Sequence, residues 1–477
     1  MKIIGIIAEF NPFHNGHEYI IRTAKESCGA DLCVVVMSGD FVQRGEPAIC
    51  DKYLRTRMAL TSGADAVFEL PGIFSRASAE QFAYGSVALL SALGCIDGIC
   101  FGSETGNIVI IREIARILVD EPAEYKAFLS DLLKSGLSFP ASREQALRKY
   151  LAGEYLKDEQ LRLLLLTALD NGLLSSPNDI LGIEYCKAIL RLRWAGINAP
   201  EPVAVKREGS SYGSSVPDTV SGASALALRK LIREGRLKEI RAFVPAVTYS
   251  ILSDEFNRSF PIFADDFSSV LYSDLLIIKS SFNNYCKNST ISADLMNAIL
   301  KNADDPISFT GLIEKLKTKN ITYSAISRAL ISIMLDTSDM ISAMRGMPVA
   351  EGADSISAVH GIPAAEGSDS ICAVHAVPAA EGSDSISAAH ALPVTEGSGS
   401  VLPPYARLLG IRRSSSALIK RINESAGCEI INKLADAKTL SVLLAKDIYA
   451  ARLYDQIIYQ KFGTRLPDEY RKTIEII

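Results

Sequence analysis

The sequence predicts an α/β fold in which a Rossmann-like parallel sheet is followed by a mostly α-helical C-terminal region. Short apolar runs alternate with amphipathic segments over residues 1–110. A polar, glycine-containing loop follows the first apolar run, and beyond residue 240 almost every segment outside one repeat has a helical pattern. Apolar strands separated by helices are typical of a parallel sheet that is covered on both faces.

The strands of the sheet are predicted from four apolar runs, at 2–10, 32–39, 65–71 and 98–104. Three amphipathic segments separate them, and we expect helices there, at 18–28, 52–63 and 78–94. A further strand with a loop is expected at 201–213. Ligands of such sheets bind outside the carboxyl ends of the strands, which places the loops 11–17, 38–47, 70–76 and 102–107 at the expected site.

Two domains follow from this pattern. We expect a Rossmann-like domain at 1–240, with a helical insertion at about 108–170, and a helical region at 241–477. A fifteen-residue repeat rich in Ala, Gly and Ser interrupts the second region at 346–400. Because this composition buries little apolar surface, we expect a weakly ordered insertion. Its histidines (His360, His375 and His390) are explained by repeat duplication.

Composition narrows the class of protein. No apolar run approaches the ~20 residues needed to span a bilayer, and the N-terminus has no signal-peptide pattern. Nine cysteines without a CxxC pair suit a reducing compartment, so we expect a cytoplasmic protein without a zinc ribbon. The net charge of −5 hides a basic segment at 401–477, which carries 13 Lys and Arg against 8 Asp and Glu.

The candidate catalytic residues lie in the loop after the first predicted strand. His14 and His17 are the only histidines outside the repeat, and they flank Gly16 at the start of a predicted helix. Imidazoles at i and i+3 share a helix face, and the helix N-terminus itself attracts phosphate. The pair is therefore expected to bind a polyphosphate and to stabilise charge on a leaving pyrophosphate, with no covalent nucleophile. The alternatives are half of a zinc site or ordinary helix caps.

The motif FNPFHNGH resembles the His-x-Gly-His signature of the adenylyl-transferring superfamily, whose members share a Rossmann-like fold and hold ATP phosphates with it. Further segments narrow the resemblance to the tRNA(Met) cytidine acetate ligase family. They are SGDFVQRGEPAICDKYLRTRMALTSGADAVFELP, SAEQFAYGSVALL, CFGSETG, SSPNDILGIEY, VKREGSSY and PPYARLLGIRRSSSALI.

That resemblance implies a ligase that activates acetate with ATP as acetyladenylate. The acetyl group then passes to N4 of the wobble cytidine of elongator tRNA(Met), forming N4-acetylcytidine. The implied catalytic residues are His14 and His17. The implied ATP-binding residues are Ile7, Ala8, Glu9, Phe10, Asn11, Pro12, Phe13, His14, Asn15, Gly16, His17, Glu18, Tyr19, Ile20, Gly102, Asn178 and Arg207.

Other residues have looser expectations. Mg²⁺ is expected to arrive with ATP, without a dedicated protein site. Arg229 is a candidate phosphate contact near Ser221 and Ser224. Gln43, Arg44, Lys52 and Arg55 are expected either at the open edge of the sheet or, for Lys52 and Arg55, on a solvated helix face.

The C-terminal region is expected to bind tRNA, with a basic cluster of Arg412, Arg413, Lys420 and Arg421 as the candidate contact. No membrane and no obligatory protein partner are expected. Two alternatives remain: a metabolic nucleotidyltransferase that uses the same site on a small phosphorylated substrate, and a non-enzymatic scaffold that kept a nucleotide site.

Overall fold

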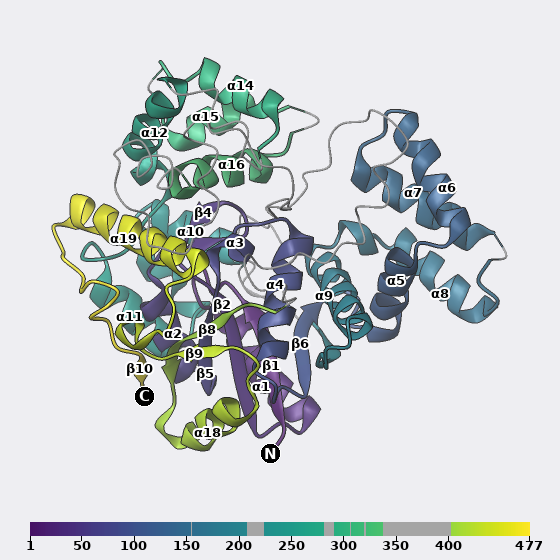
Figure 1. Ribbon diagram of the computed structural model, residues 1–477, viewed down its shortest axis with the longest axis horizontal. Helices are drawn as coiled ribbons and strands as arrows, with labels where there is room; N and C mark the ends of the chain where they lie inside the picture. The colour runs from purple at the N-terminus through teal and green to yellow at the C-terminus, as the bar shows by residue number, and fades with distance from the viewer. Residues whose placement is uncertain (154, 208–223, 281–290, 306, 319–320, 337–401) are drawn as a thin grey trace, which may run out of the picture.

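The computed structural model describes residues 1–153, 155–207, 224–280, 291–305, 307–318, 321–336 and 402–477. A mostly parallel sheet lies in the middle of the molecule, with helices on both of its faces and two further groups of helices beside it (Figure 1). The predicted fold class is therefore confirmed. The repeat at 346–400 lies outside the described residues.

The sheet begins with the strands that the apolar runs predicted. Five parallel strands run in the spatial order β5-β2-β1-β6-β7. Their bounds are β1 (Ile3–Ala8), β2 (Leu32–Ser38), β5 (Ala66–Leu70), β6 (Gly98–Ser103) and β7 (Glu201–Lys206). All five carboxyl ends consequently meet at one edge of the sheet, as the sequence predicted for the binding loops.

The C-terminal region is mostly helical, but it also returns to this sheet. Strand β8 (Tyr405–Ile411) pairs antiparallel with β5, while β9 (Glu429–Ile431) and β10 (Glu475–Ile476) pair parallel with β8. Strands from both sides of residue 240 therefore share one sheet. The predicted boundary at 240 does not coincide with an edge of the sheet, because 405–411 is buried along its whole length and pairs with β5.

Alternating residues of the strands pack into two separate hydrophobic cores. Ile4, Ile6 and Val35 pack under α1 (Asn15–Cys28), α2 (Lys52–Thr61), α10 (Ala225–Arg233) and α11 (Ala246–Glu255). Ile3 and Val34 face the other side. There they pack with α4 (Ala79–Ala92), α5 (Ile108–Asp120), α9 (Pro177–Trp194) and α18 (Ser416–Ser425). The period of two along each strand fixes this division.

Two helical groups flank the sheet (Figure 1). The helices of 108–170 are α5, α6 (Ala123–Lys134), α7 (Phe139–Ala152) and α8 (Glu159–Asp170). A third core lies among α12 (Ser268–Ser280), α14 (Ala293–Lys301), α15 (Phe309–Leu316), α16 (Tyr323–Asp336) and α19 (Val442–Phe462). None of the described helices is long and apolar enough to cross a membrane.

A small hairpin joins this second helical group to the sheet. Strands β3 (Phe41–Val42) and β4 (Glu46–Pro47) pair antiparallel, and Gly45 closes the turn with a φ of +76°. The Ser327 hydroxyl on α16 donates a hydrogen bond of 2.6 Å to the Gly45 carbonyl. A Cβ at Gly45 would lie 2.3 Å from the backbone nitrogen of Arg328, so only glycine allows this approach.

Replacing Gly45 with alanine should therefore destabilise the protein more than the backbone strain alone. Positive φ costs a non-glycine residue about 1–2 kcal/mol, and forcing α16 away adds an overpacking cost of about 1–3 kcal/mol. Gly136→Ala is the matched control, because Gly136 has a φ of +85° and nothing within 4 Å of the added Cβ. Thermal unfolding of both variants gives the comparison, and equal midpoints would show that the contact with α16 contributes nothing.

Candidate functional site

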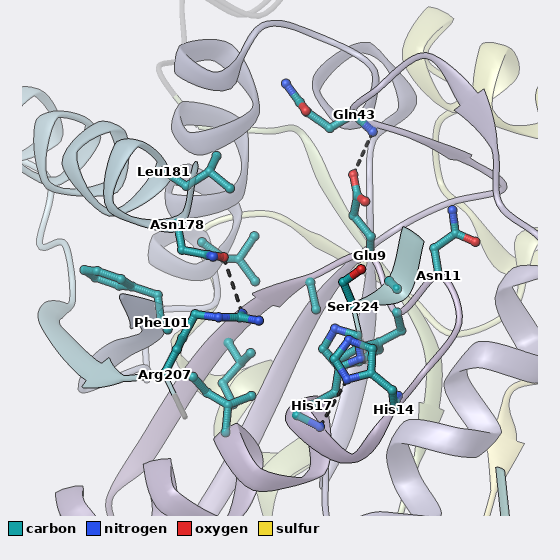
Figure 2. Close-up of a pocket in the computed structure, with 18 of the residues that line it drawn as sticks. Glu9, Asn11, His14, His17, Gln43, Phe101, Asn178, Leu181, Arg207 and Ser224 are labelled. Atoms are coloured by element: carbon teal, nitrogen blue, oxygen red, sulfur yellow. Dashed lines mark hydrogen bonds between the residues drawn. The ribbon is translucent and has the colours of Figure 1, made fainter. Parts of the chain in front are cut away.

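A pocket of about 220 Å³ opens at the carboxyl ends of β1, β6 and β7. Its described lining comes from β1 and the loop after it, from α1, α9 and α10, and from the turn between β3 and β4. Figure 2 shows polar side chains from these separate elements turned toward one space. The pocket takes lining residues from the predicted loops 11–17, 38–47 and 102–107, but none from 70–76.

His14 and His17 form the start of α1. His14 is the N-cap residue, and its Nδ1 accepts a hydrogen bond of 3.1 Å from the Gly16 amide. His17 Nδ1 accepts one of 3.2 Å from the His14 amide, and the two rings stack 3.7 Å apart. The alternative that these histidines are helix caps is therefore correct, but both also line the pocket.

These amides determine where the imidazole protons lie. Each Nδ1 accepts a backbone hydrogen, so each neutral ring carries its proton on Nε2. Burial and the nearby charges of Arg207 and Arg229 lower the pKa of His14 to about 3. Burial and the His14 ring hold the pKa of His17 well below its ordinary value. Both imidazoles are consequently neutral near pH 7, and they are suited to donate hydrogen bonds through Nε2.

Steric crowding requires glycine at position 16. A Cβ at this position would lie 2.9 Å from Cε1 of the His14 ring. The group that approaches Gly16 closely is therefore the His14 ring. A larger residue would turn that ring away from both the Gly16 amide and the pocket.

Cationic side chains surround the imidazoles. Arg207 follows β7, is exposed, and its Nη1 lies 3.5 Å from Oδ1 of Asn178. Arg229 on α10 donates a hydrogen bond of 2.7 Å to the Asn11 carbonyl. Lys206 and Arg44 also line the pocket. Four cations around two neutral donors make a site suited to a polyphosphate.

The N-terminus of α9 forms another wall of the pocket. Glu104, after β6, accepts a hydrogen bond of 2.6 Å from Asn178 Nδ2 and one of 2.9 Å from the Asp179 amide. This contact fixes Asn178 against the end of β6. A Cβ at Gly102 would lie 3.1 Å from Cγ of Arg207, so the glycine lets the arginine stem cross the strand.

Most of the residues that the resemblance named lie together here. Those that line the pocket are Ile7, Ala8, Glu9, Phe10, Asn11, His14, Gly16, His17, Tyr19, Ile20, Gly102, Asn178 and Arg207. Four named residues are absent from the lining: Pro12, Phe13, Asn15 and Glu18. Phe13 is buried against Phe10 and His17, and Asn15 Nδ2 donates to the Ala242 carbonyl, so these two support the loop.

The structure adds lining residues that the sequence analysis did not name or placed loosely. Phe101, Leu181 and Tyr185 supply apolar surface beside Arg207 and Asn178. They lie in the segments CFGSETG and SSPNDILGIEY, but their place in the pocket depends on the approach of α9 to β6. Arg229, a loose expectation, does line the pocket, and Ser224 caps α10 by accepting from the Ala227 amide. Ser221 lies outside the described residues.

The expectation that Lys52 and Arg55 lie on a solvated helix face was wrong, because both side chains are buried. Lys52 is 1% exposed and lies 2.9 Å from Glu69 Oε1 and 3.1 Å from Glu469 Oε2. Arg55 is fully buried and donates to the carbonyls of Glu9, Ser38, Gly39 and Cys50. Arg55 thereby ties the carboxyl ends of β1 and β2 together beneath the pocket.

The predicted basic cluster lies at the opposite edge of the sheet. Arg421 donates to the Met1 carbonyl, before the start of β1, and Arg412 Nε donates to the Leu60 carbonyl. Arg413 and Lys420 are exposed. Two of the four side chains are therefore engaged within the fold, at the end of the sheet away from the pocket, and their contact with tRNA stays a prediction.

No group of three or more His, Cys, Asp or Glu side chains in the described part of the chain is placed to hold a metal ion. Glu9 is the single carboxylate among the described lining residues. The other ionisable groups around the pocket are cations and neutral imidazoles, which suit an anionic ligand.

Comparison with known proteins shows which family the chain belongs to. Residues 1–348 match the family described as HIGH Nucleotidyl Transferase. The tRNA(Met) cytidine acetate ligase of Clostridium acetobutylicum is 42% identical over 69% of this chain and 78% of its own length. That of Clostridium perfringens (strain SM101) is 34% identical over 95% of both chains.

Solved structures agree. The crystal structure of Thermotoga maritima TmcAL without ligand has a TM-score of 0.77 and 27% identity, and covers all of both chains. The structure of the same protein bound with alpha-thio ATP has a TM-score of 0.74 and 26% identity over the same coverage. The chain therefore belongs to the HIGH nucleotidyl transferase family and, within it, to the tRNA(Met) cytidine acetate ligases.

Proposed function

We propose that this protein is an ATP-dependent ligase that activates acetate as acetyladenylate and transfers the acetyl group to N4 of the wobble cytidine of elongator tRNA(Met). The observation that carries the proposal is the pair of Nε2 donors of His14 and His17 at a helix N-terminus, among cations. The relatives that bear this name match up to 95% of the chain.

The proposed placement of ATP follows from the pocket. Its phosphates lie against the N-terminus of α1, within the segment Ile7 to Ile20, where the imidazoles and the helix dipole meet them. The adenosine lies toward Gly102, Asn178 and Arg207, next to the apolar surface of Phe101 and Leu181. A related protein has been crystallised with alpha-thio ATP, which supports a nucleotide in this pocket.

The first step is an in-line displacement at the α-phosphorus. An acetate oxygen attacks phosphorus and pyrophosphate leaves on the opposite side, so catalysis consists of positioning and charge stabilisation. His14 and His17 donate hydrogen bonds as charge grows on the leaving pyrophosphate, and Arg229 adds a positive charge beside them. The residues need no change of protonation state in this step.

Mg²⁺ fits as an ion that accompanies ATP. A single lining carboxylate, Glu9, offers too few oxygen ligands for a protein cage, whereas phosphate and water oxygens complete an octahedron readily. When bound, the ion would neutralise phosphate charge. The polyphosphate would otherwise be held by Arg44, Lys206, Arg207 and Arg229.

The second step requires the wobble base at the same pocket. That base is already single-stranded in its loop, so turning it outward costs little. The helical region that follows residue 240 is the proposed tRNA-binding part. We place the enzyme in the cytoplasm, where its tRNA is found, with no obligatory protein partner.

One assay tests the proposal against its rival. Purified protein is incubated with ATP, acetate and elongator tRNA(Met), and the digested nucleosides are analysed by mass spectrometry. N4-acetylcytidine that depends on both ATP and acetate supports the ligase. A metabolic nucleotidyltransferase would instead release pyrophosphate with a small phosphorylated substrate in place of acetate and tRNA, and would leave the cytidine unmodified.

A further inference from the structure

Glu9 stands apart from the other polar residues of the pocket. It lies one residue beyond β1, and its Oε1 accepts a hydrogen bond of 2.9 Å from the Gln43 amide. Its side chain points away from the stacked imidazoles, toward Gln43 (Figure 2). No other described lining residue carries a carboxylate, and the phosphate-binding role assigned above has no use for one.

The geometry of an in-line displacement indicates which part of the substrate lies near the Glu9 carboxylate. If pyrophosphate leaves on the side of His14 and His17, the attacking acetate oxygen approaches the α-phosphorus from the opposite side. Glu9 is turned away from these imidazoles, toward Gln43, and we take this to be the side of attack. The acetyl carbonyl of the mixed anhydride is therefore formed on the side of Glu9 and Gln43, and the charges of Arg44 and Arg229 offset the repulsion between the two carboxylates.

The second step needs a proton acceptor at this place. The exocyclic amine of cytidine is a weak nucleophile, and its attack on the acetyl carbon leaves a proton that must be removed. His14 and His17 cannot take it, since each Nδ1 already accepts a backbone hydrogen and each Nε2 carries a proton. The Cys100 thiol is also unsuited, because burial raises its pKa to about 12.

Resting on the proposed function, we propose that Glu9 is the general base of acetyl transfer. The cytidine N4 forms a bond to the acetyl carbon as the bond from that carbon to the phosphate oxygen breaks. The electron pair of the broken bond leaves with AMP, and the N4 proton passes to the Glu9 carboxylate. The hydrogen bond from Gln43 holds Oε1, which leaves Oε2 to receive the proton.

The electrostatic surroundings of Glu9 are consistent with this task. Burial raises the pKa of its carboxyl above the ordinary value. The hydrogen bond from the Gln43 amide, Arg229 on α10 and Arg44 on the hairpin turn lower this pKa, and Glu46 on β4 raises it. The buried guanidinium of Arg55 contacts the Glu9 carbonyl from below. A carboxylate with a raised pKa is a stronger base, so proton transfer to it is more favourable.

The test measures the two half-reactions separately in Glu9→Gln. Acetate-dependent ATP–pyrophosphate exchange should fall far less than transfer, because activation moves no proton. Single-turnover transfer from acetyladenylate to tRNA(Met) should fall by about 10²-fold, the smaller end of what a general base contributes. Glu9→Asp, which keeps the carboxylate, should recover part of the transfer rate.

The pH profile separates a base from a structural role. The deprotonated carboxylate is the active form, so wild-type transfer should fall as the pH drops through the raised pKa of Glu9. This acid limb should be absent in Glu9→Gln. The matched control is Glu46→Gln, which removes a carboxylate 4.0 Å from the same Arg229 without touching the pocket lining. It should keep the transfer rate near pH 7 and keep an acid limb, moved to lower pH because Glu46 raises the pKa of Glu9.

Two results would overturn the assignment. If Glu9→Gln loses exchange and transfer together, the carboxylate serves ATP or its metal ion. If transfer is unchanged, another group takes the proton. Both outcomes differ from failure of the proposed function, in which the wild-type protein itself makes no N4-acetylcytidine.

Discussion

His14→Ala and His17→Ala should each lower acetate-dependent ATP–pyrophosphate exchange by about 10²–10³-fold. Each change removes one Nε2 donor that we propose to stabilise the growing charge of the leaving pyrophosphate, and losing one such donor typically has this effect. The same changes remove a cap from α1, because both Nδ1 atoms accept backbone hydrogens. The cap alone is worth about 1 kcal/mol of stability, so the variants should remain folded at 25 °C.

A second pair of variants separates capping from catalysis. Asparagine is among the best N-cap residues, so His14→Asn should restore the stability of α1. Glutamine at the third helical position completes a capping box, so His17→Gln should do the same. Both side chains are shorter or differently directed than an imidazole, and exchange should stay low. Wild-type exchange in His14→Asn would mean that the cap, and not the donor, is what the reaction needs.

Lys52→Met should be the most destabilising single change in the sheet domain. Lys52, Glu69, Arg407 and Glu469 form a buried ion cluster, with side-chain exposures of 5% or less. The cluster joins α2, β5, β8 and residue 469. Removing this cation leaves Glu69 with Arg407, and Glu469 with Arg407 and Lys472. Asp40, 3.8 Å from Lys52, also loses a partner. Negative charge that is buried without full compensation costs about 3–5 kcal/mol. Thermal and urea unfolding at pH 7 measure the loss.

Two controls make this result interpretable. Lys420→Met removes a lysine whose side chain is 81% exposed, and it should change stability by less than about 0.5 kcal/mol. The double variant Lys52→Met/Glu469→Gln removes one charge of each sign and should recover part of the loss. A loss below about 1 kcal/mol in Lys52→Met would show that water or rearrangement solvates the cluster.

The sequence predicted the parts of the fold that depend on local pattern. Apolar runs predicted β1, β2, β5 and β6, because strands buried on both faces are apolar throughout. Strand β8 has the same kind of composition, yet it lies among helical segments more than 330 residues after β5. Nothing local indicates which distant strand it joins, so the sequence did not reveal that it completes the sheet.

The residues of the candidate site were likewise predicted only where a local sequence motif marks them. His14, Gly16 and His17 were found because one motif places them at a strand-to-helix turn. Glu9 was named only as part of a segment, and its separate direction depends on the Gln43 amide. Lys52 was misplaced because a charged residue on a predicted helix suggests a solvated face. Its partner Glu469 is more than 400 residues away, where no periodicity can reveal it.

The late return of β8 has a consequence for synthesis on the ribosome. The chain emerges from its N-terminus, so β5 is made long before the strand that covers its edge. Until residues 405–411 leave the exit tunnel, β5 offers an unpaired backbone edge that another chain can join. The 346–400 repeat lengthens this delay, because its residues are made between β5 and β8. The ATP pocket, although built mostly from early residues, therefore rests on a sheet that is completed last.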